Sequence, residues 1–167
     1  MKIYNAPQNN AQAIVADHKI NNIISIYSPN VTFPIFTGVR NSQVLRLCFN
    51  DIIRPYDNLK IITQNDIEKI INFVTEKGRR DILVHCYAGV SRSIAVTMLL
   101  IFLLEKNIKV DELVSLVKNK APFANPNKLV LMQAGRVLHE EKFFEALAKY
   151  FNGKNKIIKA REFYIEL

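Results

Sequence analysis

Short runs of branched apolar residues alternate along this chain with segments in which apolar residues recur every three or four positions. The short runs predict buried strands, and the periodic segments predict amphipathic helices. The predicted strands are residues 2–4, 22–27, 44–49 and 81–85, and the predicted helices are residues 7–19, 63–77, 93–106, 110–119 and one that opens at Asn125-Pro126. This order, β-α-β-β-α-β followed by helices, predicts an α/β fold: a single domain with a central, mostly parallel sheet flanked by helices.

Local signals mark several helix ends. Thr63 followed by Asp66 resembles a capping box at the start of the second predicted helix, and Gly78 supplies a stop after it. Asp111 is expected to cap the fourth predicted helix. Pro126 is expected in the first turn of the last one, where its missing N–H costs nothing.

Length and composition are those of one ordinary globular domain. The chain has 167 residues, of which 49% are hydrophobic and 23% charged. We assign residues 1–150 to the domain and residues 151–167 to a basic tail that either docks or stays mobile. The longest apolar run, residues 94–104, is too short to span a bilayer, so no transmembrane segment is expected.

Net charge and cysteine content indicate the kind of partner and the cellular location. The net charge of +8 and the isoelectric point near 9.5 favour anionic partners without identifying them. No motif with interleaved stacking aromatics indicates nucleic-acid binding. Two cysteines, Cys48 and Cys86, are too few for a disulfide scaffold, which favours a reducing, cytoplasmic location.

The strongest chemical signal lies between the predicted strand 81–85 and the apolar helix 93–106. Residues 85–93 read His-Cys-Tyr-Ala-Gly-Val-Ser-Arg-Ser. Cys86 is a candidate nucleophile, because the helix terminus and Arg92 both favour its thiolate form. Arg92 can clamp two phosphate oxygens with its planar guanidinium, and Gly89 lets the backbone approach a ligand closely.

The loop between the cysteine and the arginine is expected to bind phosphate through its backbone N–H groups. Its residues are Tyr87, Ala88, Gly89, Val90 and Ser91. Tyr87 is interpreted either as a wall of the substrate pocket or as a partly exposed loop aromatic.

This motif resembles the signature of cysteine-based protein tyrosine phosphatases, specifically the compact dual-specificity branch. The Asn-Asp-Ile after a strand and the Pro-Asn segment near residue 126 are also similar to those of bacterial members. The resemblance implies a dual-specificity-phosphatase-like fold. It also implies that His85 orders the cysteine loop and that Ser93 assists departure of the sulfur when the phospho-enzyme breaks down.

The reaction also needs a general acid, because an alkoxide or phenoxide is a poor leaving group unless it is protonated. The resemblance places this acid on a loop after a strand, some thirty residues before the cysteine. Asp51 lies 35 positions before Cys86 and directly follows the strand 44–49, whereas Asp57 lies 29 positions before it. Asp51 is favoured and Asp57 is the alternative. The mechanism requires no metal or cofactor, and the three histidines are scattered.

Substrate class is less sharply indicated. The phosphate loop carries no charged residue between Cys86 and Arg92, which argues against multiply phosphorylated phosphoinositides. The resemblance implies phosphotyrosine, and in addition phosphoserine or phosphothreonine, on a phosphorylated protein. The alternatives are RNA ends or phosphoinositides as substrates, or a non-catalytic module that binds phosphosites. Cys48 is read as a core residue, or else as a partner that traps oxidised Cys86 as a disulfide.

Overall fold

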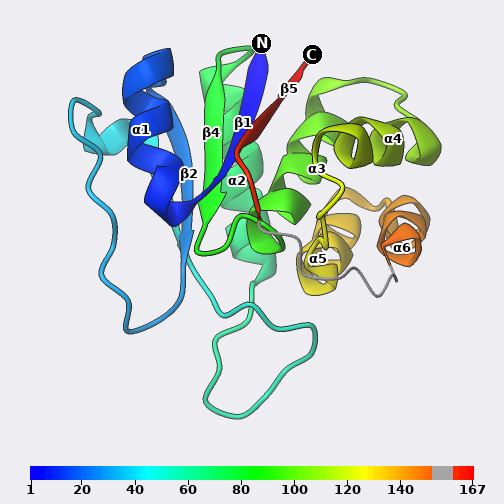
Figure 1. The fold of residues 1–167 in the computed structure, drawn as a ribbon. Coiled ribbons are helices and arrows are strands. Elements are labelled where there is room, and N and C mark those ends of the chain that lie inside the picture. Colours follow the sequence, from blue (N-terminus) through cyan, green and yellow to red (C-terminus); the bar gives the residue numbers. More distant parts are fainter. Residues whose placement is uncertain (152–159) are drawn as a thin grey trace.

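A five-stranded sheet forms the centre of the computed structural model, which describes residues 1–151 and 160–167 (Figure 1). The strands are β1 (Lys2–Pro7), β2 (Asn22–Tyr27), β3 (Val44–Cys48), β4 (Ile82–Cys86) and β5 (Phe163–Glu166), in the order β3-β2-β4-β1-β5. The pairings among β1 to β4 are parallel, and β5 runs antiparallel to β1. The predicted α/β class and mostly parallel sheet are therefore confirmed.

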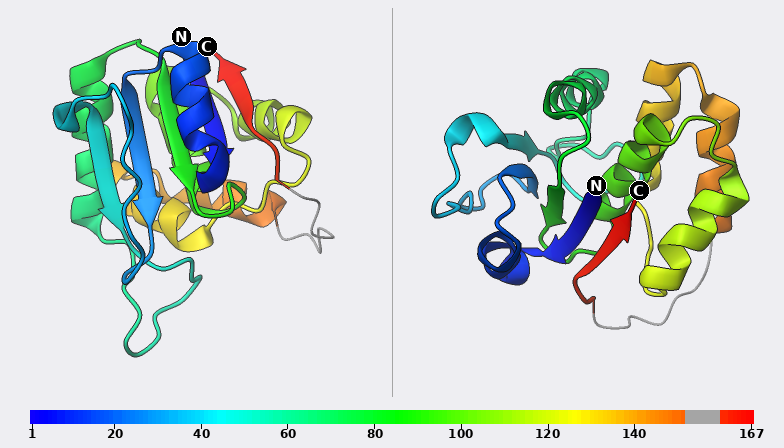
Figure 2. Two further views of the ribbon diagram at one scale, coloured as in Figure 1. Left: turned by 60° about the vertical axis from the view of Figure 1, so that its left-hand side comes forward. Right: turned by 90° about the horizontal axis from the view of Figure 1, so that it is seen from above.

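Helices cover both faces of this sheet. They are α1 (Gln8–His18), α2 (Gln64–Lys77), α3 (Arg92–Leu104), α4 (Val110–Lys120), α5 (Lys128–Leu138) and α6 (Glu141–Tyr150), with a 3-10 turn at Asn41–Gln43. One face is covered by α1. The opposite face carries α2, α3 and α4, with α5 and α6 packed against those helices (Figures 1 and 2). Ten consecutive residues of α3, from Arg92 to Ile101, are buried, as its nearly continuous apolar sequence predicts.

The predicted ends of the second helix, α2, are confirmed. The side chain of Thr63 accepts a hydrogen bond from the backbone N–H of Asp66 at 3.2 Å, and the Asp66 carboxylate accepts one from the N–H of Thr63 at 3.0 Å. Gly78 follows the helix with a φ of 61°, a conformation that glycine adopts readily. Each of these signals acts within a few residues of the helix.

Two other predicted helix starts are wrong. Asp111 does not cap α4: it lies within the first turn and accepts a hydrogen bond from the hydroxyl of Tyr150, while Lys109 holds the capping position. Pro126 lies before α5 and not within its first turn. Asn127 caps that helix by accepting the N–H of Val130 at 3.1 Å. In both cases a neighbouring residue takes the capping position: the Asn127 side chain caps α5, and the N–H of Lys109 donates to the carboxylate of Glu112 at 3.0 Å at the start of α4.

The C-terminal residues contribute a strand that the sequence patterns did not indicate. In β5, Ile165 pairs with Ile3 and is 2% exposed, so this part of the proposed tail is docked in the sheet. The two chain ends lie side by side (Figure 1), and the N–H of Leu167 donates to the carbonyl of Met1 at 2.9 Å. Residues 152–159, which include all three lysines of the tail, lie outside the described residues.

Candidate active site

The predicted phosphate loop connects the end of β4 to the start of α3. Cys86 is the last residue of β4 and is 1% exposed, and Arg92 is the first residue of α3. Three loop carbonyls accept N–H groups from other segments: Tyr87 from Gln8, Val90 from Asn125, and Ser91 from Asn127, at 3.1–3.2 Å. These bonds hold the loop at the N-terminus of α3, where backbone N–H groups can bind an anion.

Position 89 requires glycine for two reasons, its backbone conformation and the closeness of the neighbouring backbone. Its φ is +71°, and a Cβ built on it would lie 2.7 Å from the backbone nitrogen of Pro7 and 3.0 Å from the carbonyl carbon of Ala6. Its N–H donates to the Cys86 sulfur at 3.3 Å. The loop thus packs on the end of β1 at a point where no side chain fits.

Arg92 is anchored by one end of its guanidinium. Its Nη1 donates to the carbonyl of Phe49 at 2.8 Å and to the hydroxyl of Ser28 at 3.0 Å, and the residue is 3% exposed. Its Nε has no hydrogen-bond partner among residues 1–151 and 160–167. A buried donor that lacks a partner costs free energy, so this nitrogen is a site for an incoming phosphate oxygen.

Asp51 lies beside this arginine. Its Oδ2 is 4.0 Å from Arg92 Nε, and its Oδ1 accepts hydrogen bonds from Ser91 Oγ at 2.7 Å and from Asn127 Nδ2 at 2.8 Å. The side chain is 36% exposed, so it is open to a ligand. Asp57, the alternative acid, lies in an exposed turn, and no hydrogen bond in the described part of the chain joins it to the loop. The geometry therefore favours Asp51.

Asn127 is the site residue whose role the sequence did not indicate. It is 2% exposed, and its Nδ2 donates to Asp51 and also to the carbonyl of Ile52 at 3.0 Å. Its backbone N–H donates to Ser91, and its side-chain oxygen caps α5. One residue thus ties Asp51 to the predicted phosphate loop and to a helix start. The Pro-Asn segment was the only sequence signal for it.

His85 and Ser93 flank the motif but face different surroundings. Ser93 Oγ lies 3.2 Å from the Cys86 sulfur and is fully buried. The His85 ring instead packs edge-on against Phe36, and neither ring nitrogen has a hydrogen-bond partner within the described residues. Burial, aided by the charge of Arg92, lowers the pKa of His85 to about 4 despite an opposing contribution from the backbone of Cys86. His85 is therefore neutral near pH 7 and places no charge beside Cys86.

Cys48 lies on the face of the sheet opposite Cys86. Side chains alternate along a strand, and Cys48 pairs with Tyr27, two residues after Ser25, which pairs with His85. Cys86, the next residue after His85, belongs to the α3-side core with Leu47. This placement does not support the interpretation of Cys48 as a disulfide partner of Cys86.

Two pockets adjoin the ends of the phosphate loop. A pocket of about 490 Å³ is lined by Gln8, Asn9, Pro34 and Tyr87, whose side chain is 71% exposed. The second, of about 260 Å³, includes Ser91 and Asn127 together with the exposed Ile53. Tyr87 therefore lines a pocket beside the loop, and both interpretations of it, as a wall and as an exposed aromatic, agree with this position.

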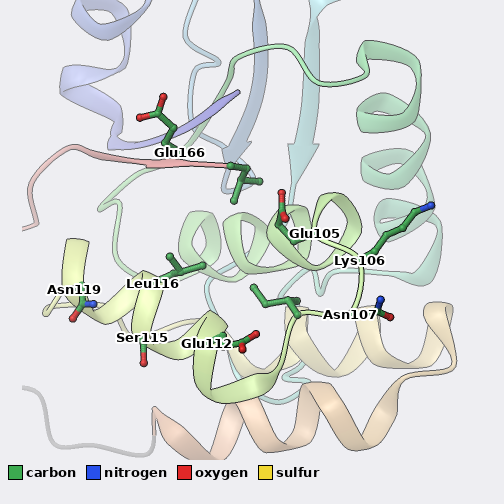
Figure 3. A pocket seen from close by; sticks show the side chains of 10 residues that line it. Glu105, Lys106, Asn107, Glu112, Ser115, Leu116, Asn119 and Glu166 are labelled. Atoms are coloured by element: carbon green, nitrogen blue, oxygen red, sulfur yellow. The ribbon is translucent and has the colours of Figure 1, made fainter.

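A further pocket of about 520 Å³ lies at the other end of α3 (Figure 3). Carboxylates of Glu105, Glu112 and Glu166 line it, which disfavours phosphate. Glu105 follows α3, whereas Arg92 begins it, so about 20 Å of helix separates this pocket from the cysteine. In the described part of the chain no group of three or more acidic, histidine or cysteine side chains could hold a metal ion, and no helix is long and apolar enough to cross a membrane.

Comparison with known proteins identifies the family from the sequence and finds the same fold in solved structures. The family model for the dual specificity phosphatase catalytic domain matches residues 3–137. A Dictyostelium discoideum protein named a probable dual specificity protein phosphatase is 33% identical over 81 residues, which are 47% of this chain. The chain spans about a fifth of that relative's length, since the match covers 20% of it.

Solved structures share the fold at low sequence identity. The crystal structure of human tyrosine phosphatase-like serine/threonine/tyrosine-interacting protein matches with a TM-score of 0.62 and 22% identity, over 82% of this chain and 91% of that one. DUSP15 matches with a TM-score of 0.60 and 21% identity, over 90% and 92%. PTPMT1 in complex with PI(5)P matches with a TM-score of 0.55 and 16% identity, over 87% and 86%.

Proposed function

The chain belongs to the dual specificity phosphatase family, and from this premise we propose that it hydrolyses phosphate monoesters on proteins through a cysteinyl-phosphate intermediate. The observation that carries the proposal is the convergence of three groups at one loop. Cys86 lies at its base, the unpartnered Nε of Arg92 at its end, and the Asp51 carboxylate 4.0 Å from that nitrogen. These are a nucleophile, a phosphate clamp and an acid.

In the first step the Cys86 thiolate attacks phosphorus and the bond to the substrate oxygen breaks. Loop N–H groups and Arg92 stabilise the charge on the phosphate oxygens as it develops. Asp51, protonated, gives its proton to the departing oxygen. Its two hydrogen bonds, from Ser91 and Asn127, hold the carboxyl group over the loop.

In the second step water attacks the cysteinyl phosphate. Asp51, now a carboxylate, takes a proton from that water as the new P–O bond forms. The electron pair of the P–S bond returns to sulfur, and Ser93 Oγ, at 3.2 Å, is close enough to donate a hydrogen bond to the departing thiolate. The products are inorganic phosphate and the free enzyme.

We propose phosphotyrosine, with phosphoserine and phosphothreonine as further substrates. Support comes from the rim of the loop, where the exposed Tyr87 and the neutral side chains of Gln8 and Asn9 line one pocket. An aryl ring has apolar surface to pack there, whereas a multiply phosphorylated headgroup needs cations. The phosphoinositide bound to PTPMT1 in its crystal structure makes that class of lipid the necessary comparison substrate.

The test is phosphate release from phosphotyrosine, phosphothreonine, aryl phosphate, phosphoinositide and RNA substrates, with chelator present. We expect release from the phosphopeptides that disappears in Cys86→Ser. Asp51→Asn is expected to slow alkyl phosphates by about 100-fold and activated aryl phosphates far less, since general acids contribute about that much. Asp57→Asn serves as the matched control. If Asp57→Asn gave the larger effect, the assignment of the acid would be wrong, and turnover retained by Cys86→Ser would refute the mechanism.

A further inference from the structure

A chain of hydrogen bonds leads from the nucleophile into the core of the protein. Ser93 Oγ lies 3.2 Å from Cys86 Sγ and 3.3 Å from Asn5 Oδ1, and Asn5 Nδ2 donates to Thr97 Oγ1 at 3.0 Å. Ser93 and Thr97 are one turn apart on α3, and Asn5 extends from β1 to reach both. Asn5, Ser93 and Thr97 are each 0% exposed.

An amide in this position calls for an explanation. Asn5 is in a central strand between β4 and β5, and its side chain points to the α3 face, where Ile3 of the same strand joins the apolar core. A buried amide is destabilising unless it is hydrogen-bonded, and an apolar residue would suit this strand better. The partners that offset this cost are two hydroxyl groups, one of which touches the nucleophile.

The direction of these hydrogen bonds depends on whether Cys86 carries a proton. In the observed arrangement the thiol donates to Ser93, Ser93 donates to the Asn5 carbonyl oxygen, and the Asn5 amide donates to Thr97. A thiolate cannot donate and needs the single proton of the Ser93 hydroxyl. The Asn5 oxygen then competes with the sulfur for that proton.

Rotation of the Asn5 amide by half a turn removes this competition. The oxygen and nitrogen of an amide occupy nearly the same space, so both orientations fit. In the rotated form Thr97 donates to the Asn5 oxygen, the Asn5 nitrogen donates to Ser93, and Ser93 donates to the thiolate. Each group in the chain keeps a partner in both protonation states, and consecutive hydrogen bonds polarise one another.

We propose that Asn5 is a positioning residue: it directs the Ser93 hydroxyl proton toward the sulfur when Cys86 is a thiolate, by reversing the buried chain. The effect of Asn5 on hydrolysis of the cysteinyl phosphate rests on the proposed function, because the sulfur leaves phosphorus only in that reaction. The effect of Asn5 on the free thiolate of Cys86 does not depend on the proposed function. Among the other charged or polar groups of the described residues, the N–H of Gly89 donates to the Cys86 sulfur, Arg92 and Asp51 lie 4.0 Å apart at the end of the same loop, and neutral His85 lies on the other sheet face.

The decisive variant is Asn5→Asp, which keeps the shape but offers only acceptors. Its carboxylate accepts from both Ser93 and Thr97 and so holds the Ser93 proton away from sulfur. We expect the pH midpoint for alkylation of Cys86 by iodoacetamide to rise by about one unit. We also expect hydrolysis of the cysteinyl phosphate to slow about tenfold, the worth of one hydrogen bond to a charged group. Asn5→Ala, which removes the amide without adding charge, is expected to slow hydrolysis about threefold.

A cycle with Ser93→Ala separates this role from a simple charge effect. If Asn5 acts through Ser93, neither Asn5 variant changes the alkylation midpoint or the hydrolysis rate further once Ser93 is alanine. Ser25→Ala is the matched control, because Ser25 in β2 is also fully buried but lies on the opposite face of the sheet, and we expect no shift from it. If Asn5→Asp does not fold, the same double-mutant cycle is measured with Asn5→Ala and Ser93→Ala.

The outcomes are distinguishable from failure of the phosphatase proposal. Absence of turnover in the unmodified protein refutes the proposed function but leaves the alkylation profile readable. The positioning role is overturned if Asn5→Asp and Asn5→Ala have an undiminished effect in the Ser93→Ala background. It is also overturned if the alkylation profiles are equal for the protein with and without the Asn5 amide.

Discussion

Replacing Asn127 tests whether a neutral amide holds Asp51, the proposed catalytic acid, in place. Asn127 has two separable tasks: its side-chain oxygen caps α5, and its Nδ2 donates to Asp51 Oδ1 at 2.8 Å and to the Ile52 carbonyl at 3.0 Å. Serine caps helices as well as asparagine does, but it is too short to reach the carboxylate. Asn127→Ser therefore removes the hold on the acid and keeps the helix start, whereas Asn127→Ala removes both.

The expected magnitudes follow from these contacts. Loss of the cap costs about 1 kcal/mol, and each lost hydrogen bond about another 1 kcal/mol. Asn127→Ala should thus lower the free energy of unfolding by about 3 kcal/mol and Asn127→Ser by about 2 kcal/mol. A positioned general acid contributes about 100-fold or more to the rate, so an Asp51 that is no longer held over the loop should slow reactions that need the acid by about 10- to 100-fold.

The assay compares substrates that differ in their need for an acid. Both Asn127 variants should reduce kcat/KM for alkyl phosphates by that factor and for activated aryl phosphates by much less. Urea denaturation gives the stability of each variant, so that rate and folding effects are read separately. If Asn127→Ser slowed aryl and alkyl phosphates equally, or slowed neither, the inference that Asn127 positions the acid would be refuted.

Three further predictions concern the scaffold. Gly89→Ala, which places a Cβ 2.7 Å from the Pro7 nitrogen at a positive φ, should lower the free energy of unfolding by about 1–3 kcal/mol and cut turnover, both measurable on one preparation. The pKa of His85 falls from 6.5 to about 4 on folding, so its contribution is present above pH 6.5 and is lost as the pH drops toward 4. The free energy of unfolding obtained from urea denaturation should therefore decline over this range, by up to about 3 kcal/mol, and less steeply in His85→Gln; parallel declines would contradict a buried neutral histidine. Ile165→Ala in β5 should cost about 3 kcal/mol if this edge strand belongs to the folded unit, whereas a change under 0.5 kcal/mol would show that it does not.

The parts of this structure that were predictable from sequence are those whose signals are local. The capping residues of α2 lie within the helix or next to it, and the apolar run of α3 needs no partner to indicate burial. The strand, loop and helix around Cys86 are contiguous, so one motif indicates them together. Local signals do not indicate β5, because it is a four-residue strand whose partner β1 lies at the opposite end of the chain.

The roles of Asn5 and Asn127 could not be predicted from the sequence for a related reason. Asn5 and Asn127 are short polar residues that occur in loops and turns of every kind, and their type carries no signal of burial. Only the fold shows that Asn5 reaches Ser93, 88 positions away, and that Asn127 reaches Asp51, 76 positions away. Long-range hydrogen bonds have no periodicity that a single sequence could reveal.

These two amides support different parts of the reaction, and kinetics can separate them. Asp51 serves in both proposed steps, as acid and then as base, whereas Ser93 serves in the second. Asn127→Ser should therefore slow both the initial burst and the steady-state rate of an alkyl phosphate. Asn5→Asp should leave the burst with an aryl phosphate unchanged and slow only the steady state, at a pH high enough for Cys86 to be alkylated at its limiting rate. A smaller burst rate in Asn5→Asp at that pH would mean that the buried chain also contributes to attack on phosphorus.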